Sequence, residues 1–142
     1  IAQVMTEQGW TVTREHIAGE TNGRTSLDGS RRIIVDDKIS DAQAAKTMIH
    51  EAAHAPMHAN GDIDPAALHR GRAEVEADSV AYVLAAPLGL DTTDYSIGYI
   101  AGWGNGDLEV ITDTARAVLA TVHTLAEALE PATDEAEDTA AA

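Results

Sequence analysis

The stretch of sequence that decides the fold is Lys46-Thr47-Met48-Ile49-His50-Glu51-Ala52-Ala53-His54. It lies within a run of small and apolar residues at helical spacing that begins after Ser40. Ser40 with Gln43 three residues later is a capping-box pattern, which marks the start of a helix. We expect Pro56 to end or kink this helix near Ala55, because proline removes a backbone donor and restricts the residue before it.

His50 and His54 are four residues apart, so in a helix their side chains lie on the same face. Two imidazoles at this spacing can bind one Zn²⁺ at about 2.0–2.1 Å each. Glu51 projects beside the metal, where it is placed to accept a proton from a metal-bound water rather than to be the third ligand. The spacing therefore predicts two zinc ligands and a catalytic base; the alternative is a pair of surface histidines on a polar helix.

The composition limits the chemistry that this chain can carry. The 142 residues suit one domain, and the absence of cysteine excludes disulfides, thiolate metal sites and a catalytic thiol. A metal must then be held by His, Asp or Glu. The net charge of -15 argues against a basic nucleic-acid surface on this chain. With no Phe, the core must use Ala, Val, Ile, Leu and Met, which favours closely packed helices.

The residues before Ser40 indicate strands. Ile1–Gln8 reads as the end of a helix closed by Gly9, and three strand candidates follow, at Trp10–Arg14, Arg24–Leu27 and Arg31–Asp36. Asp28-Gly29-Ser30 is a hairpin signal between the last two strands. We therefore predict a small antiparallel sheet.

The residues after Ser40 indicate helices. Beyond the first helix, Asp64 and Pro65 start a second helix that continues to about Ala86 and that Gly71 is expected to interrupt. Further helices are predicted at Asp94–Trp103 and Asp107–Leu129, and the acidic segment Glu130–Ala142 is expected to be disordered. Strands followed by helices predict an α+β domain over residues 1–129.

A catalytic zinc site needs a third protein ligand. Glu74 lies on the second predicted helix, and Asp78 follows it on the same face. This pattern resembles the gluzincin peptidases, whose ligand Glu is followed four residues later by an Asp that hydrogen-bonds the first ligand His. The resemblance implies that Glu74 binds the metal and Asp78 holds His50. Glu76 and Asp78 remain alternative ligands, and a solvated acidic face is the alternative to any such role.

The chain also resembles the metallopeptidase domain of ArdC-type antirestriction proteins, which is related to the ImmA/IrrE family of zincin-like peptidases. The resemblance covers roughly residues 31–103 and rests on four segments: Lys46–His54, Glu74–Asp78, Ala81–Leu90 with its Leu88-Gly89-Leu90 end, and Tyr95–Trp103. The ArdC group often has Glu where this chain has Asp78, and Gly near Pro56. The group typically carries an upstream single-stranded-DNA-binding domain, which nothing here resembles. Because the chain begins with Ile1, we expect it to be part of a longer protein.

Other polar residues carry weaker signals. His58 is four residues after His54, but Pro56 intervenes, so it is as compatible with a surface loop as with the cleft. His69 is a candidate substrate-binding group, and one of the three tyrosines is a candidate oxyanion donor, with packing as the alternative: Tyr82, Tyr95 and Tyr99.

The sequence thus predicts a zinc-dependent metallopeptidase that hydrolyses peptide bonds, with Glu51 as general base on a zinc-bound water. Its partners would be protein or peptide substrates, with no membrane and no direct nucleic-acid contact by this chain. Without cysteines, a signal peptide or an apolar segment of membrane-spanning length, we expect a cytoplasmic protein. The alternative function is a non-proteolytic antirestriction or regulatory module whose structural zinc site supports binding of a protein or DNA-processing partner.

Overall fold

The computed structural model describes residues 1–59, 70–93 and 108–129. Several sequence predictions lie outside these ranges: the helix start at Asp64, the helix at Asp94–Trp103 and the acidic tail. Within them, three strands precede the long helices, so the chain is α+β as predicted.

The sheet has strand order β1-β3-β2, with β1 at Thr11–Glu15, β2 at Gly23–Thr25 and β3 at Arg32–Asp36. β2 and β3 are antiparallel, as the hairpin signal predicts. Gly29 in their turn has a φ of 83°, a conformation that glycine adopts without steric cost. The prediction of a wholly antiparallel sheet is wrong, because β1 pairs with β3 in parallel.

The mixed sheet follows from the route of the chain between β1 and β3. Residues 16–22 cross to the far side of β3, so that β2 pairs there and not with β1. The connection from β1 to β3 is long enough for a parallel pair, which needs a crossover of a dozen or more residues. The alternating pattern that identifies a strand says which side chains face the core, here Ile33 and Val35, but not the direction of its neighbour.

The first helix ends before a glycine and the second begins after a serine, as the sequence predicts. A short helix α1 (Ala2–Glu7) ends before Gly9, whose φ is 85°. The central helix α2 (Asp41–His58) starts after Ser40, whose hydroxyl oxygen accepts a hydrogen bond from the Gln43 backbone N–H at 3.2 Å. This bond satisfies one of the free donors of the first turn.

The predicted end of α2 near Ala55 is wrong, because the helix continues through Pro56 to His58. Pro56 lies in the last turn, where its missing N–H removes only one bond of the helix. The turn closes through the Ala59 N–H, which donates to the Ala55 carbonyl at 3.3 Å. Burial of Ala55 and His58 stabilises this turn and keeps His58 on the helical face of His54.

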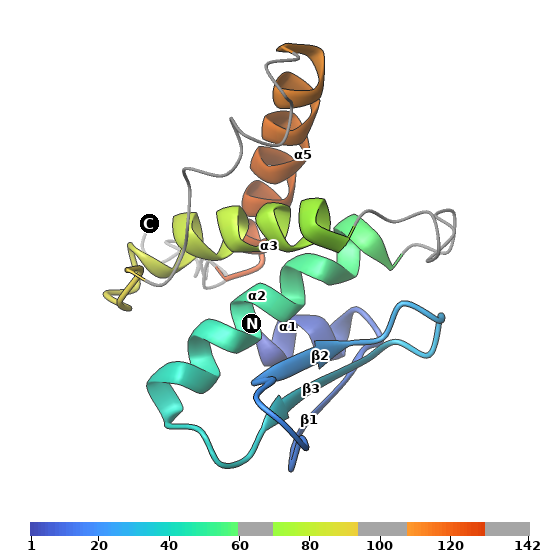
Figure 1. The fold of residues 1–142 in the computed structure, drawn as a ribbon, viewed down its shortest axis with the longest axis vertical. Coiled ribbons are helices and arrows are strands. Elements are labelled where there is room, and N and C mark those ends of the chain that lie inside the picture. Colours follow the sequence, from blue (N-terminus) through green and yellow to red (C-terminus); the bar gives the residue numbers. More distant parts are fainter. Residues whose placement is uncertain (60–69, 94–107, 130–142) are drawn as a thin grey trace, which may run out of the picture.

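Figure 1 shows α2 running between the sheet and helix α3 (Arg70–Ala85), with helix α5 (Leu108–Glu127) packed beyond. α3 continues through Gly71 without the predicted interruption. The buried core between these elements is rich in alanine, and five alanines on α2 and α3 have no exposed surface: Ala52, Ala53, Ala77, Ala81 and Ala85. Such small side chains let two helix backbones approach closely, which brings the polar residues of α3 within reach of those on α2.

Among the described helices, none is both long and apolar enough to cross a membrane.

Candidate metal centre

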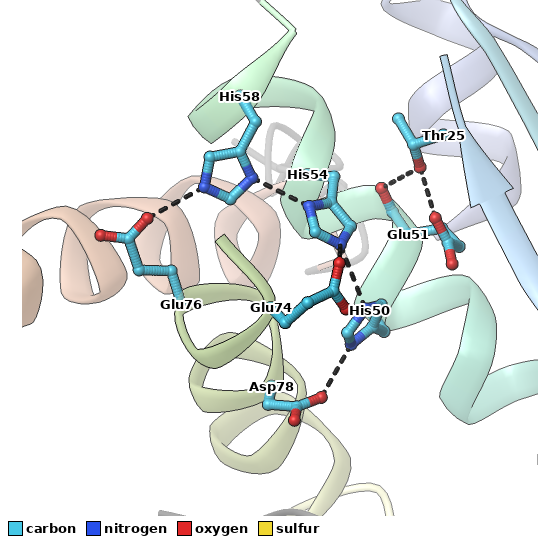
Figure 2. Close-up of polar contacts among 8 residues, drawn as sticks. All are labelled: Thr25, His50, Glu51, His54, His58, Glu74, Glu76 and Asp78. Atoms are coloured by element: carbon cyan, nitrogen blue, oxygen red, sulfur yellow. Dashed lines mark hydrogen bonds and ion pairs between the residues drawn. The ribbon is translucent and has the colours of Figure 1, made fainter. Parts of the chain in front are cut away.

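Three predicted ligands come together where α2 faces α3. The Nε2 atoms of His50 and His54 are 3.1 Å apart. The Glu74 carboxylate reaches both rings, with Oε2 at 3.3 Å from the His50 Nε2 and Oε1 at 3.7 Å from the His54 Nε2. Figure 2 shows these groups converging from two helices. One potential ligand atom from each residue lies within 4.8 Å of the others, so the group could hold a metal ion.

The spacing of these atoms fits zinc. Ligands at about 2.0–2.1 Å from a tetrahedral ion are separated from each other by about 3.3 Å. The Nε2–Nε2 distance of 3.1 Å and the distances of 3.3 and 3.7 Å from the two Nε2 atoms to the two Glu74 oxygens are close to that value. Two imidazoles and one carboxylate are also the protein donor set of several catalytic zinc sites, which leave the fourth position for water.

Asp78 holds the outer side of the His50 ring. Its Oδ1 lies 2.9 Å from the His50 Nδ1. A carboxylate at this position accepts the Nδ1–H bond, which directs the Nε2 atom toward Glu74 and His54. The structure therefore places Asp78 at the position that the gluzincin resemblance implies.

The electrostatics of this group favour a cation. Burial lowers the pKa of His50, but the hydrogen bonds to Asp78 and Glu74 outweigh it and raise that pKa to about 10. The same hydrogen bond from His50 lowers the pKa of Glu74. Without a metal, the proton on His50 is thus the charge that balances two carboxylates. A divalent cation can replace that proton, and binding it would release the proton to solvent.

His54 is more deeply buried than His50, with 10% of its side chain exposed. Burial, followed by the charge of His50, lowers the pKa of His54 to about 4, so its ring is neutral. Its Nδ1 atom lies 2.9 Å from the Nδ1 of His58, and the His58 Nε2 lies 2.9 Å from the Glu76 Oε2. Both of these partners are buried.

Glu51 lies on the opposite side of the histidines from Glu74, toward the sheet (Figure 2). The Thr25 hydroxyl on β2 is 2.7 Å from the Glu51 Oε2 and 2.8 Å from the Glu51 carbonyl oxygen. Burial raises the pKa of Glu51, with the hydrogen bond from Thr25 acting in the opposite direction. A carboxyl group with a raised pKa is a better general base at neutral pH than an ordinary glutamate.

Gly23 makes room for this carboxylate. A Cβ atom built there would lie 2.6 Å from the Glu51 Oε1 and 2.5 Å from the Thr47 Cγ2. Any larger residue must displace one of these two side chains. β2 therefore approaches α2 closely because it begins with glycine.

These residues line a cleft of about 680 Å³. The loop before β2 and β2 itself form one wall, and α2 and α3 supply the other side with His50, His54 and Glu74. The volume is in the range of small-molecule and peptide-binding sites. Glu51 and the three candidate ligands thus open onto the same space.

The remaining candidates lie elsewhere. Glu76 does not reach the ligand group and instead contacts His58, so it is neither a ligand nor a solvent-facing residue. Tyr82 is half-buried on α3 and is not among the residues lining the cleft. His69, Tyr95 and Tyr99 lie outside the described residues.

A second group with metal-ligand spacing contains His16, Asp36 and Asp37. Its Asp36 Oδ1 accepts the backbone N–H groups of Ile17 and Lys38 at 3.4 and 3.3 Å. These bonds hold the chain just after β1 and just after β3, so we interpret this carboxylate as structural.

The sequence prediction included Asp78 but missed the other supporting partners of the site. The spacing of His54 and His58 was a usable signal, but the proline between them argued for the end of the helix. Nothing in the sequence marks Thr25 or Gly23, because their role depends on how the sheet packs against α2.

The comparisons with known proteins give one match. The family model of the IrrE N-terminal-like domain, peptidase family M78, matches residues 5–96, which is more than half of the chain. No curated protein and no solved structure matches significantly. The matched segment contains the sheet, α2 and α3, and thus every residue of the candidate metal centre. The chain belongs to the family of the IrrE N-terminal-like domain.

Proposed function

We propose that this protein is a zinc-dependent peptidase of the zincin-like type, with His50, His54 and Glu74 as metal ligands. The observation that carries the proposal is that the two His Nε2 atoms lie 3.1 Å apart, with a Glu74 oxygen 3.3 Å from one and the other Glu74 oxygen 3.7 Å from the second, beside a buried glutamate in one cleft. Membership of a peptidase family supports it.

The reaction divides between the metal and the protein. A bound zinc ion supplies a Lewis acid that lowers the pKa of water toward neutrality. Glu51 accepts the proton of the attacking water and later returns it to the leaving amine. Thr25 keeps the Glu51 carboxylate on the sheet side of the cleft through the 2.7 Å hydrogen bond. Asp78 keeps the His50 Nε2 directed at the site.

A polypeptide is the substrate class that this cleft suits best. β2 is at the edge of the described sheet, and its residues Gly23 to Thr25 line the cleft. An edge strand offers backbone donors and acceptors to which an extended peptide can add as a further strand. Such pairing would carry a backbone carbonyl past Glu51 without dependence on the peptide's side chains.

Within the family, the resemblance of the ligand helices to ArdC-type antirestriction proteins supports the further proposal of an antirestriction role. The net charge of -15 favours a second candidate, a regulatory module that binds a basic partner without cleaving it. The two candidates differ in whether Glu51 must accept a proton.

Glu51→Gln separates these functions. The variant keeps the shape and the Thr25 contact but loses the base, so we expect zinc stoichiometry to be unchanged and peptide hydrolysis to fall by about 10²–10⁴-fold. Zinc content is measured by elemental analysis and hydrolysis on a quenched-fluorescence peptide library. Glu7→Gln, at an exposed residue of α1, is the matched control and should behave like the wild type.

An equal rate of hydrolysis in the Glu51→Gln variant would refute Glu51 as the base. Antirestriction activity that persists in this variant would favour the binding module over the peptidase.

A further inference from the structure

Behind the candidate metal centre, a buried chain of hydrogen bonds runs from His54 away from the cleft. The His54 Nδ1 is 2.9 Å from the His58 Nδ1, and the His58 Nε2 is 2.9 Å from the Glu76 Oε2 (Figure 2). The side chains of His58 and Glu76 are only 2% and 9% exposed. None of the peptidase chemistry described above uses these two residues.

We propose that His58, held by Glu76, is a positioning residue that fixes the ring orientation and tautomer of His54 for metal binding. The inference rests on the proposed zinc site. Its starting point is that a metal ligand must present a nitrogen lone pair, and His54 faces the site with Nε2. Its single ring proton must then be on Nδ1.

The direction of each hydrogen bond follows from the far end of the chain. A carboxylate only accepts, so Glu76 receives the His58 Nε2–H. With this proton on Nε2, the His58 ring presents the lone pair of Nδ1, and among the described residues that atom has the His54 Nδ1 at hydrogen-bond distance. His54 must donate its own Nδ1 proton, which leaves its Nε2 free for the metal.

Arg72 makes this direction consistent with the local charge. Its Nε donates to the Glu76 Oε1 at 2.8 Å, so the charge of Glu76 is already paired with a guanidinium. The Glu76 carboxylate is thus held by two donors, Arg72 on its own helix and His58 on α2.

The two ligand histidines are thus supported in different ways. The Nδ1 of His50 contacts the Asp78 carboxylate directly. The Nδ1 of His54 contacts the His58 imidazole, which in turn contacts the Glu76 carboxylate. Partners of this kind fix ligand orientation, and their loss typically costs about 10–100-fold in metal affinity. The continuation of α2 through Pro56 places His58 at the required spacing.

The test compares two substitutions of His58 in the full chain. His58→Gln keeps the pattern, because its amide oxygen accepts from His54 and its amide nitrogen donates to Glu76. His58→Leu fills similar space with no polar atom. We expect zinc affinity, measured by competition with a chromophoric chelator, to weaken about 10–100-fold in His58→Leu and to stay near the wild-type value in His58→Gln. His123→Leu, at an exposed histidine of α5, is the control.

Two spectroscopic readouts separate positioning from general stability. Long-range ¹H–¹⁵N NMR of the metal-free wild type should show His54 as the Nδ1–H tautomer. The visible spectrum of the Co²⁺-loaded protein should change in His58→Leu and be retained in His58→Gln. The NMR result decides the proposal even if His58→Leu does not fold.

Failure of this inference differs from failure of the zinc site. If the wild type binds no zinc, the proposed function is wrong. If the wild type binds zinc and both His58 variants bind it as tightly as the wild type, only the role of His58 is overturned. The same holds if His54 is the Nε2–H tautomer.

Discussion

At the scale of single residues, the candidate site depends on side chains that position other side chains. Glu51 shows this most clearly. Its carboxylate has one described side-chain hydrogen bond, from Thr25, and it also lies close to the backbone of Gly23 on the same strand. The proposed base is therefore positioned by the sheet as much as by its own helix.

Thr25→Val should lower the rate of hydrolysis without loss of zinc. Valine has nearly the shape of threonine, but it cannot donate to Glu51, and a hydrogen bond of this kind is worth about 1 kcal/mol. We expect a reduction of about five- to tenfold in kcat, measured on the same peptide as Glu51→Gln. Thr13→Val makes the same change on β1, away from the cleft, and should leave kcat unaltered. An equal effect of both variants would argue against a role for Thr25.

His50 gives the metal-free protein a distinct pH dependence. Its folded-state pKa of about 10 is above the ordinary value of 6.5, because Asp78 and Glu74 favour the protonated ring over the opposing effect of burial. Its contribution to stability is therefore complete below pH 6.5 and is lost as the pH rises toward 10.

Denaturant unfolding of the metal-free protein at several pH values measures this contribution. The free energy of unfolding should fall between pH 6.5 and 10 more steeply in the wild type than in His50→Gln. Parallel curves for the two proteins would contradict the raised pKa.

At the scale of elements, the candidate metal centre is the contact between two helices. α2 supplies both candidate histidine ligands and Glu51, and α3 supplies Glu74, Glu76 and Asp78. These side chains meet because fully buried alanines lie at the contact between the two helices and let the helices approach closely. Helix packing and ligand geometry are thus set by the same residues.

Ala77→Leu should weaken both the packing of α2 against α3 and the binding of zinc. The added methyl groups must push α3 away from α2, and overpacking of this kind costs about 1–3 kcal/mol. We expect a lower melting temperature and weaker zinc binding, measured by calorimetry and chelator competition. Ala117→Leu, at an exposed position of α5, is the control and should change neither. Unchanged zinc affinity in a destabilised Ala77→Leu protein would show that the packing of the two helices does not set the ligand geometry.

The elements themselves were largely predictable from the sequence. Helix starts have local signals, such as Ser40 with its bond to Gln43, and strands have alternating patterns. Where the prediction failed, the deciding interactions were not local. The direction of β1 depends on the crossover to β3, and the end of α2 depends on the burial of its last turn.

At the scale of the whole molecule, the site lies where two parts of the chain face each other across α2. The sheet holds Glu51 from one side, and α3, backed by α5, brings Glu74 and its neighbours from the other (Figure 1). The five residues His50 to His54 were enough to predict the two histidines and Glu51 as members of the candidate site. Assigning Glu74 required a resemblance, and the roles of Thr25 and His58 required the fold.

The central claim is that His50, His54 and Glu74 bind one zinc ion, and a crystal of the zinc-loaded protein measured at the zinc absorption edge tests it most directly. The account predicts one anomalous peak per chain, at about 2.0–2.1 Å from the two His Nε2 atoms and from a Glu74 oxygen. A peak ligated by other residues, or no peak between these three in zinc-saturated crystals, would contradict it.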